Sequence, residues 1–480
     1  MIVGVDIGTQ SLKAVVLSPE MKIIGEHAVP YQPNFPQPGW AEQDPLLWEG
    51  ALLPAIHGAL AQAKCKAHEV KAIGLGGQLD GCIAIDRQGM PLHPCLIWMD
   101  RRADINGIDA DQVHQTCGVV LDATHLAAKI RWLKANVPAV AQAVKFHVPV
   151  SYMVSRLTGM HVIDHATAST SMVYGLKAQS YDTPLLGAFG ITADELPRAM
   201  DGAAVAGSLS TLGASLTGLG SGIPVAVGTG DDFSSAIGAG LVDAGRFINV
   251  IGTAEVTGAL HPVPVIDPGR LVETHAFMGG QYYIENPGWL SGGALVWFRD
   301  TFRLASFDHL TALAQEAPPG AGGVTFIPAL SGAMAPEWIA SARGAFYGLT
   351  PSHGVQHLAR ALLEGLAFAM RDVFDRTKEL GVSAEALRIV GGGARSALWK
   401  QIRADLIGLP AETPLHTDTS AIGAALLAAK AAGRISDIGE AVRALNPVAD
   451  VTLPLARHRD AYENAYRRYR QVFASLRPLF

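Results

Sequence analysis

Three things are scarce in this chain of 480 residues: cysteine, charge and long apolar segments. The four cysteines form no Cys-x-x-Cys pair, which predicts free thiols and a cytoplasmic protein rather than a disulfide framework. Charged residues make up 17% of the chain, and the formal net charge of -6 argues against a nucleic-acid or anionic-membrane partner. The longest stretch without charge, 202–230, is rich in glycine and contains Pro224, so we expect no membrane span. The first residues show no signal peptide.

Glycine is what the chain has in excess. It supplies 52 of the 480 residues, whereas about 7% is usual in globular proteins, and it follows no collagen-like period. Hydrophobic residues make up 49%, which excludes disorder and allows roughly two to four domains with buried cores. We therefore expect the extra glycines in tight turns at strand ends, most of them facing one ligand cleft.

A weak internal repeat divides the chain. Short apolar runs alternate with helical patterns, which predicts an α/β fold. Gly8-Thr9 and Gly252-Thr253 each follow one short apolar strand and precede another, about half the chain apart. We therefore predict two similar halves, residues 1–240 and 241–480, each opening with a strand, a glycine turn and a strand.

The first of these turns is suited to an anion. Asp6 ends the preceding strand, and a buried carboxylate needs a cation or a hydrogen-bond donor beside it. A glycine turn can point several backbone N–H groups at a phosphate, which would need a divalent metal between it and the carboxylate. An ordinary hairpin turn is the alternative interpretation. The side chains that add donors are Thr9, Gln10, Ser11 and Lys13.

Three more glycine turns follow apolar strands. In the first, Asp231 and Asp232 come directly after Gly228-Thr229-Gly230, and paired carboxylates can deprotonate a hydroxyl; a solvated acidic turn is the plainer alternative. Together these turns favour phosphoryl transfer to an alcohol in a cleft between two domains. The others are Gly76 to Gly81, where the Gln78 and Asp80 side chains can bind hydroxyls, and Gly391-Gly392-Gly393 before a helix.

In their order and spacing, these motifs resemble the FGGY family of carbohydrate kinases, in the actin-like ATPase superfamily, over nearly the whole chain. The resemblance implies two RNase H-like α/β domains with a cleft between them, and ATP- and Mg²⁺-dependent phosphorylation of a small sugar. Within the family the chain is most similar to xylulokinases, which implies a ketopentose such as D-xylulose. The matching segments are Asp6 to Thr9, Ile97 to Arg102, Lys129 to Leu133, Gly230 to Asp232, Ile251 to Thr253, Phe326 to Gly332, Gly344 to Leu349, Leu358 to Glu364 and Gly391 to Ser396.

The resemblance also implies roles for single residues. Asp231 matches the general base that takes the proton of the attacking hydroxyl, and Asp6 matches the carboxylate that, with Asp231, holds Mg²⁺ through water. The phosphate-binding positions are Thr9, Gln10, Ser11 and Lys13 on the first turn and Gly252 and Thr253 on the second. Gly292, Gly392 and Gly393 match other nucleotide contacts, and Gln78, Leu79, Asp80 and Asp232 match sugar contacts.

Three segments depart from the xylulokinase pattern. Those kinases have Gln-Met-His-Gly where this chain has Gln78-Leu79-Asp80-Gly81, and a carboxylate only accepts hydrogen bonds whereas an imidazole also donates them. Ser331 to Pro336 lacks both charges of the family's Ser-Gly-Glu-Arg-Thr-Pro, and Ala397 replaces a larger residue near the nucleotide. Ribulose, erythritol and glycerol therefore stay open as acceptors. A nucleotide-switched, non-enzymatic protein of the actin or chaperone kind is the alternative from another class.

The remaining conspicuous residues are interpreted as structural. We assign Trp98 and the other tryptophans to packing and the cysteines to the core. His275 and the other histidines show no metal-ligand spacing. Since dimers are common among similar kinases, a homodimer is an expectation.

Overall fold

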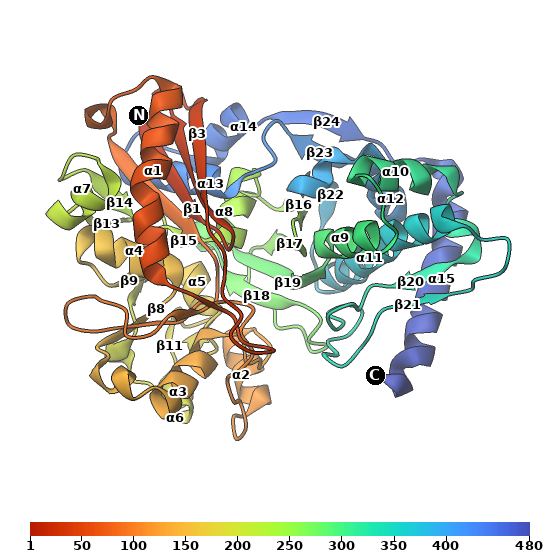
Figure 1. The fold of residues 1–480 in the computed structure, drawn as a ribbon, viewed down its shortest axis with the longest axis horizontal. Coiled ribbons are helices and arrows are strands. Elements are labelled where there is room, and N and C mark those ends of the chain that lie inside the picture. Colours follow the sequence, from red (N-terminus) through yellow and green to blue (C-terminus); the bar gives the residue numbers. More distant parts are fainter.

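A computed structural model describes residues 1–480 and contains two α/β lobes, each built on a seven-stranded sheet (Figure 1). The strands of the first sheet are β1 (Ile2–Ile7), β2 (Ser11–Leu17), β3 (Ile23–Pro30), β5 (Ala72–Gly77), β13 (Val205–Ser208), β14 (Pro224–Ala226) and β15 (Thr229–Gly230). Those of the second are β16 (Gly245–Ile251), β17 (Ala254–His261), β18 (Glu273–Ala276), β19 (Tyr282–Leu290), β22 (Ala384–Val390), β23 (Ala411–Pro414) and β24 (Val448–Thr452).

The two sheets repeat one topology. The first has the order β13-β14-β5-β1-β2-β3, and the second has β24-β23-β22-β16-β17-β19, with β18 added at its edge. Pairing directions also agree: β1 runs parallel to β5 and antiparallel to β2, as β16 does to β22 and β17. The Gly8-Thr9 turn joins β1 to β2, and Gly252-Thr253 joins β16 to β17. The predicted internal repeat is therefore confirmed.

Helices cover both sheets and connect their strands (Figure 1). No helix has the length and apolar character needed to cross a membrane. In the first lobe they are α1 (Pro45–Ala63), α2 (Ala110–Cys117), α3 (Leu126–Asn136), α4 (Pro149–Thr158), α5 (His165–Ser169), α6 (Thr183–Phe189), α7 (Thr211–Thr217) and α8 (Asp231–Gly238). Then come α9 (Gly292–Thr301), α10 (Phe307–Glu316), α11 (Val355–Glu379), α12 (Ala397–Ile407), α13 (Ser420–Ala431), α14 (Ile438–Leu445) and α15 (Arg459–Leu476).

Five two-stranded ribbons complete the fold. Four of them build out the first lobe between β3 and β13, and the fifth lies in the second lobe. They are β4 (Glu42–Gln43) with β7 (Cys95–Leu96), β6 (Ile83–Ile85) with β8 (Lys145–His147), β9 (Val162–Asp164) with β12 (Arg198–Met200), β10 (Tyr174–Gly175) with β11 (Ser180–Tyr181), and β20 (Thr325–Ile327) with β21 (Ala345–Tyr347).

Local sequence sets several helix ends. The Asp44 side chain accepts a hydrogen bond of 3.0 Å from the N–H of Leu46, and Pro45 occupies the first turn of α1, where a missing N–H costs nothing. Beyond α11, Gly381 has a φ of 96°, a left-handed conformation that glycine adopts without strain. Both helix ends are therefore set by residues at or next to them in the sequence.

Helix α13 lies at the junction of the two lobes. It belongs to the second half of the chain but packs against β1 and β5 of the first sheet and against α8. Glycine permits this approach, because an added Cβ at Gly238 or Gly423 would lie 2.1 Å or 2.0 Å from a carbonyl oxygen across the α8–α13 contact. Gly238 therefore faces the contact between α8 and α13 and not the cleft. The division at residue 240 stays a prediction.

Candidate active site

A cavity of about 330 Å³ lies between the lobes, where the two glycine turns face each other. Thr9 comes from the first turn and Gly252 and Thr253 from the second, while Asp231 and Asp232 come from the start of α8. No lysine or arginine lines this cavity, although Asp6, Asp80, Glu273, Glu285 and Asp418 do. The site is therefore acidic and needs cations or hydrogen-bond donors from its ligands.

Asp6 lies at the end of β1, beside the first turn. Its Oδ1 accepts a hydrogen bond of 2.8 Å from the Ser420 hydroxyl, at the first residue of α13. Burial and the neighbouring Asp231 carboxylate raise the pKa of Asp6 to about 7. A cation placed between Asp6 and Asp231 would relieve both the burial cost and the repulsion.

Asp231 and Asp232 begin α8. Asp231 Oδ1 accepts a hydrogen bond of 3.0 Å from the N–H of Asp232, and the helix dipole favours negative charge at this end. Burial, and then the neighbouring carboxylates, nevertheless raise the pKa of both side chains above the usual range. A carboxylate with a raised pKa is a stronger base, which suits proton removal from a hydroxyl.

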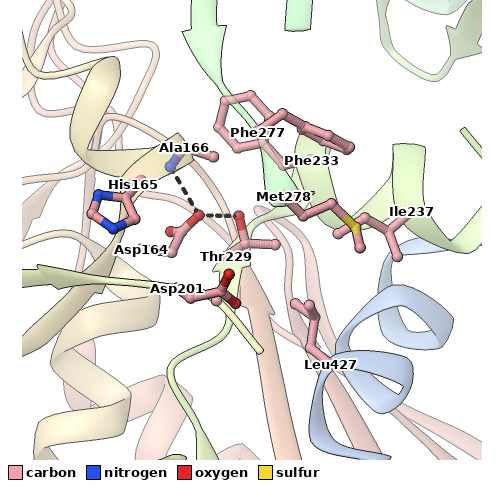
Figure 2. Close-up of a pocket in the computed structure, with 11 residues that line it drawn as sticks. Asp164, His165, Ala166, Asp201, Thr229, Phe233, Ile237, Phe277, Met278 and Leu427 are labelled. Atoms are coloured by element: carbon pink, nitrogen blue, oxygen red, sulfur yellow. Dashed lines mark hydrogen bonds between the residues drawn. The ribbon is translucent and has the colours of Figure 1, made fainter. Parts of the chain in front are cut away.

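Hydrogen bonds within the first lobe hold β15, the short strand before Asp231, in position, and Figure 2 shows the bond between Thr229 and Asp164. The Thr229 hydroxyl donates to Asp164 Oδ2 over 2.7 Å, and the N–H of Gly230 donates to the Thr167 hydroxyl over 2.8 Å. Asp164 also caps α5, accepting from the N–H groups of Ala166 and Thr167. A small cavity of about 30 Å³ adjoins these groups. These contacts set the position at which Asp231 enters the main cavity.

The two turns have different neighbours. In the first, the Thr9 hydroxyl accepts a hydrogen bond of 3.0 Å from the Trp98 indole, and the Thr9 carbonyl accepts one of 2.6 Å from the Gln43 side chain. In the second, the N–H of Gly292 at the start of α9 donates to the carbonyl of Gly252 over 3.1 Å. An added Cβ on Gly292 would lie 2.3 Å from that carbonyl oxygen. Gly292 thus holds the second turn against α9.

The other end of the cavity is lined by polar side chains from both lobes. Asp80 has a φ of 53°, and its Oδ1 accepts a hydrogen bond of 2.8 Å from the Thr170 hydroxyl. His125 Nδ1 lies 3.2 Å from Asp80 Oδ2. Across the cavity, His275 Nε2 lies 3.3 Å from Glu285 Oε1. This end offers many acceptors and a few donors, which is the pattern that a chain of hydroxyl groups requires.

Only some of the predicted site residues line the cavity. Gln78 is buried beneath it, donating to Gln43 over 2.7 Å. Lys13 is paired with Asp418, and Gln10 is exposed. Those that line the cavity are Asp6, Thr9, Leu79, Asp80, Asp231, Asp232, Gly252 and Thr253. Those outside its lining are Gln10, Ser11, Lys13, Gln78, Gly292, Gly392 and Gly393, the last two in a 3₁₀ turn after β22.

Sequence reasoning missed several residues of this cavity. The assignment of Trp98 to packing is wrong, because its ring lines the cavity and is 37% exposed. His125 immediately precedes α3 and belongs to none of the motifs above. It lies four residues before Lys129, where a segment that resembles the family begins. Chain spacing gave no signal for the rest: Thr170, Glu273, His275, Glu285 and Ser420.

The residues present fit a magnesium ion held through water. No three His, Cys, Asp or Glu side chains are arranged to bind a metal directly. In phosphoryl-transfer sites Mg²⁺ keeps several waters and takes one or two carboxylates together with the substrate phosphates. Asp6 and Asp231, buried near each other with no lysine or arginine in the lining, have the required charge.

Several known proteins with the same fold and a similar sequence are glycerol and xylulose kinases. Residues 1–238 match the N-terminal domain and residues 247–432 the C-terminal domain of the FGGY family of carbohydrate kinases. The chain is 33% identical over 453 residues to a glycerol kinase of Halorhodospira halophila, covering 90% of this chain and 88% of that protein. It is 29% identical over 487 residues to the xylulose kinase of Escherichia coli, covering both chains fully at 100%. A crystal structure described as a xyloylose kinase from Brucella ovis has a TM-score of 0.93 and 29% identity, covering 100% of each chain.

Proposed function

Because the chain belongs to the FGGY family of carbohydrate kinases, we propose that it transfers the γ-phosphoryl group of ATP to a terminal hydroxyl of a ketopentose such as D-xylulose. The fold is that of the actin-like ATPase superfamily, as predicted, and sugar kinases of this family use ATP. One observation carries the proposal: the Asp231 carboxylate lines the same cavity as the two glycine turns and the hydroxyl-binding groups.

In this proposal Asp231 is the general base. Its raised pKa, caused first by burial and then by Asp232, lets it accept the proton of the acceptor hydroxyl as that oxygen attacks phosphorus. The contacts of Thr229 and Gly230 hold it in place. Closure of the two lobes over the bound substrates would keep water away from the reacting phosphate and so limit hydrolysis of ATP.

The phosphates would lie between the two turns. Thr9, with its neighbours Gln10, Ser11 and Lys13, and Gly252 with Thr253 supply N–H and hydroxyl donors on opposite sides. Asp6 and Asp231 would hold Mg²⁺ through water, and the ion supplies neutralising charge for the phosphate oxygens. Gly392 and Gly393 are proposed for the adenosine, and Gly292 acts by holding the second turn against α9.

Several polar side chains surround the acceptor end, which supports an acceptor longer than glycerol. Glycerol presents three hydroxyls, whereas the side chains here are Asp80, His125, Thr170, Asp232, Glu273, His275 and Glu285. Ribulose and erythritol stay as alternatives of similar size, and glycerol, which the names of several relatives favour, stays open because Asp80 replaces the xylulokinase histidine.

Measurement of ADP release with and without an acceptor panel tests the proposal. We expect D-xylulose to stimulate ATP turnover above D-ribulose, L-ribulose, erythritol and glycerol. Stimulation by glycerol alone would replace the ketopentose with a polyol. Absence of stimulation by every acceptor would instead favour the nucleotide-switched alternative. The cytoplasmic location and the homodimer stay predictions, and light scattering after size exclusion measures the latter.

A further inference from the structure

The acceptor end of the cavity carries a distinctive balance of charge. Asp80, Asp232, Glu273 and Glu285 line it, and no lysine or arginine does. The nearest buried amine, Lys129, donates instead to the backbone carbonyls of Asp80 and Ile97, over 2.6 and 2.9 Å. A negatively charged acceptor would therefore find no lysine or arginine here.

His125 is the one cationic donor that this end provides. It is 5% exposed, and it lies between two carboxylates: Nδ1 is 3.2 Å from Asp80 Oδ2, and Nε2 is 3.8 Å from Glu273 Oε1. Nδ1 nevertheless has no hydrogen-bond partner, because its contact with Asp80 is close but not aligned. A buried donor without a partner costs free energy, and a ligand oxygen in the cavity can supply the missing bond.

Asp80 and His125 are both charged. Burial alone would lower the pKa of His125, but the Asp80 carboxylate raises it well above the ordinary value. Burial alone would raise the pKa of Asp80, but His125 keeps it below the ordinary value. Asp80 therefore stays an acceptor, while the His125 imidazolium donates.

We propose that Asp80 and His125 together select a neutral polyhydroxy acceptor over a sugar acid of the same carbon skeleton. His125 donates from Nδ1 to one hydroxyl oxygen, and Asp80 accepts the O–H of an adjacent hydroxyl. A substrate carboxylate would face the negative side chains of Asp80 and Glu273, with the single His125 charge to offset them. The inference rests on the proposed sugar kinase function.

Matched acceptor pairs test this selectivity: xylitol with xylonate, ribitol with ribonate, and sorbitol with gluconate, besides D-xylulose. For the wild type we expect kcat/KM for each acid to be at least about 100-fold below that of its neutral partner. In D80N, which keeps the side-chain size, we expect the acid-to-neutral ratio to rise about tenfold or more. In H125Q, which removes the positive charge, we expect the ratio to fall further. For both variants KM for the neutral acceptor should rise more than kcat falls.

The opposite signs separate selection from a general structural effect. H114Q changes a buried histidine that does not line the cavity and should leave the ratio unchanged, and ADP affinity with circular dichroism checks the fold of every variant. Shifts of the same sign in D80N and H125Q would overturn the inference, as would wild-type use of acids and neutral acceptors alike. Absence of turnover with every acceptor would overturn the proposed function, and this selectivity with it.

Discussion

The two lobes have the same strand order but different chemistry at equivalent places. Asp6 stands one residue before the end of β1, and the uncharged Val250 stands at the equivalent place in β16. Helix α8 begins with Asp231, whereas its counterpart α13 begins with Ser420, whose hydroxyl donates to Asp6. The first lobe thus supplies Asp6 and Asp231, and the second lobe supplies a hydrogen-bond donor to Asp6. The two lobes repeat one fold but contribute differently to a single reaction, because their side chains differ at equivalent positions.

The largest expected effect comes from substitutions at the first residues of α8 and α13. D231A should lower kcat by about 1,000-fold with nucleotide affinity retained, because general-base catalysis is lost. S420A, the change at the equivalent position of α13, should lower kcat by about tenfold or less. Steady-state ADP release measures both, and near-normal turnover of D231A would contradict its role as the base.

The two turns provide the next comparison. D6N should lower kcat by roughly 100-fold and raise the Mg²⁺ concentration needed for half-maximal rate, since one metal-directed carboxylate is lost. Adding V250D to D6N should not restore activity, because the second turn has no donor equivalent to Ser420. Recovery in the double variant would show that the two turns are interchangeable. A magnesium titration of each variant decides between these outcomes.

The junction of α8 and α13 is where the lobes are most tightly joined. G423A should lower the free energy of unfolding by about 2 kcal/mol, because its Cβ would lie 2.0 Å from the carbonyl oxygen of Ser234. G187A in α6 is the matched control: nothing lies within 4 Å of its Cβ, so it should be neutral or stabilising by up to ~1 kcal/mol. Urea unfolding measures both, and equal effects would exclude close packing as the reason for Gly423.

Asp164, in the first lobe, supports β15, the short strand that leads into Asp231. D164A should lower kcat by roughly tenfold with less change in KM, because Thr229 loses its acceptor and Asp231 is held less firmly. D164N keeps one acceptor oxygen and should recover part of the loss. Equal kcat values for D164A and the wild type would contradict the positioning role.

The last comparison concerns the pH dependence of stability. The pKa of Asp6 is about 7 when folded, mainly through burial, against about 3.9 unfolded, so its contribution to stability is present below pH ~4 and lost as pH rises through 7. D6N cannot titrate, so at pH 8 and without Mg²⁺ it should be more stable than the wild type. The difference should vanish near pH 4. Thermal unfolding across this range measures it, and a D6N variant less stable at pH 8 would contradict the direction.

The sequence by itself determined the local elements and the order of the motifs. Apolar runs ending in glycine predicted β1, β5 and β22, and the spacing of the two Gly-Thr pairs predicted the repeated topology. Asp6 and Asp231 could be singled out because a carboxylate directly after a buried strand is costly without a purpose. These inferences succeed because each depends on neighbouring residues.

Only the tertiary structure decided which side chains meet. Ser420 reaches Asp6 across 414 positions of the chain, and His125 reaches Asp80 and Glu273 from a different element. No local pattern marks such contacts, since they depend on how helices and strands from both halves pack. The same packing explains part of the glycine excess, which serves the crossing of α8 and α13 as well as the cleft.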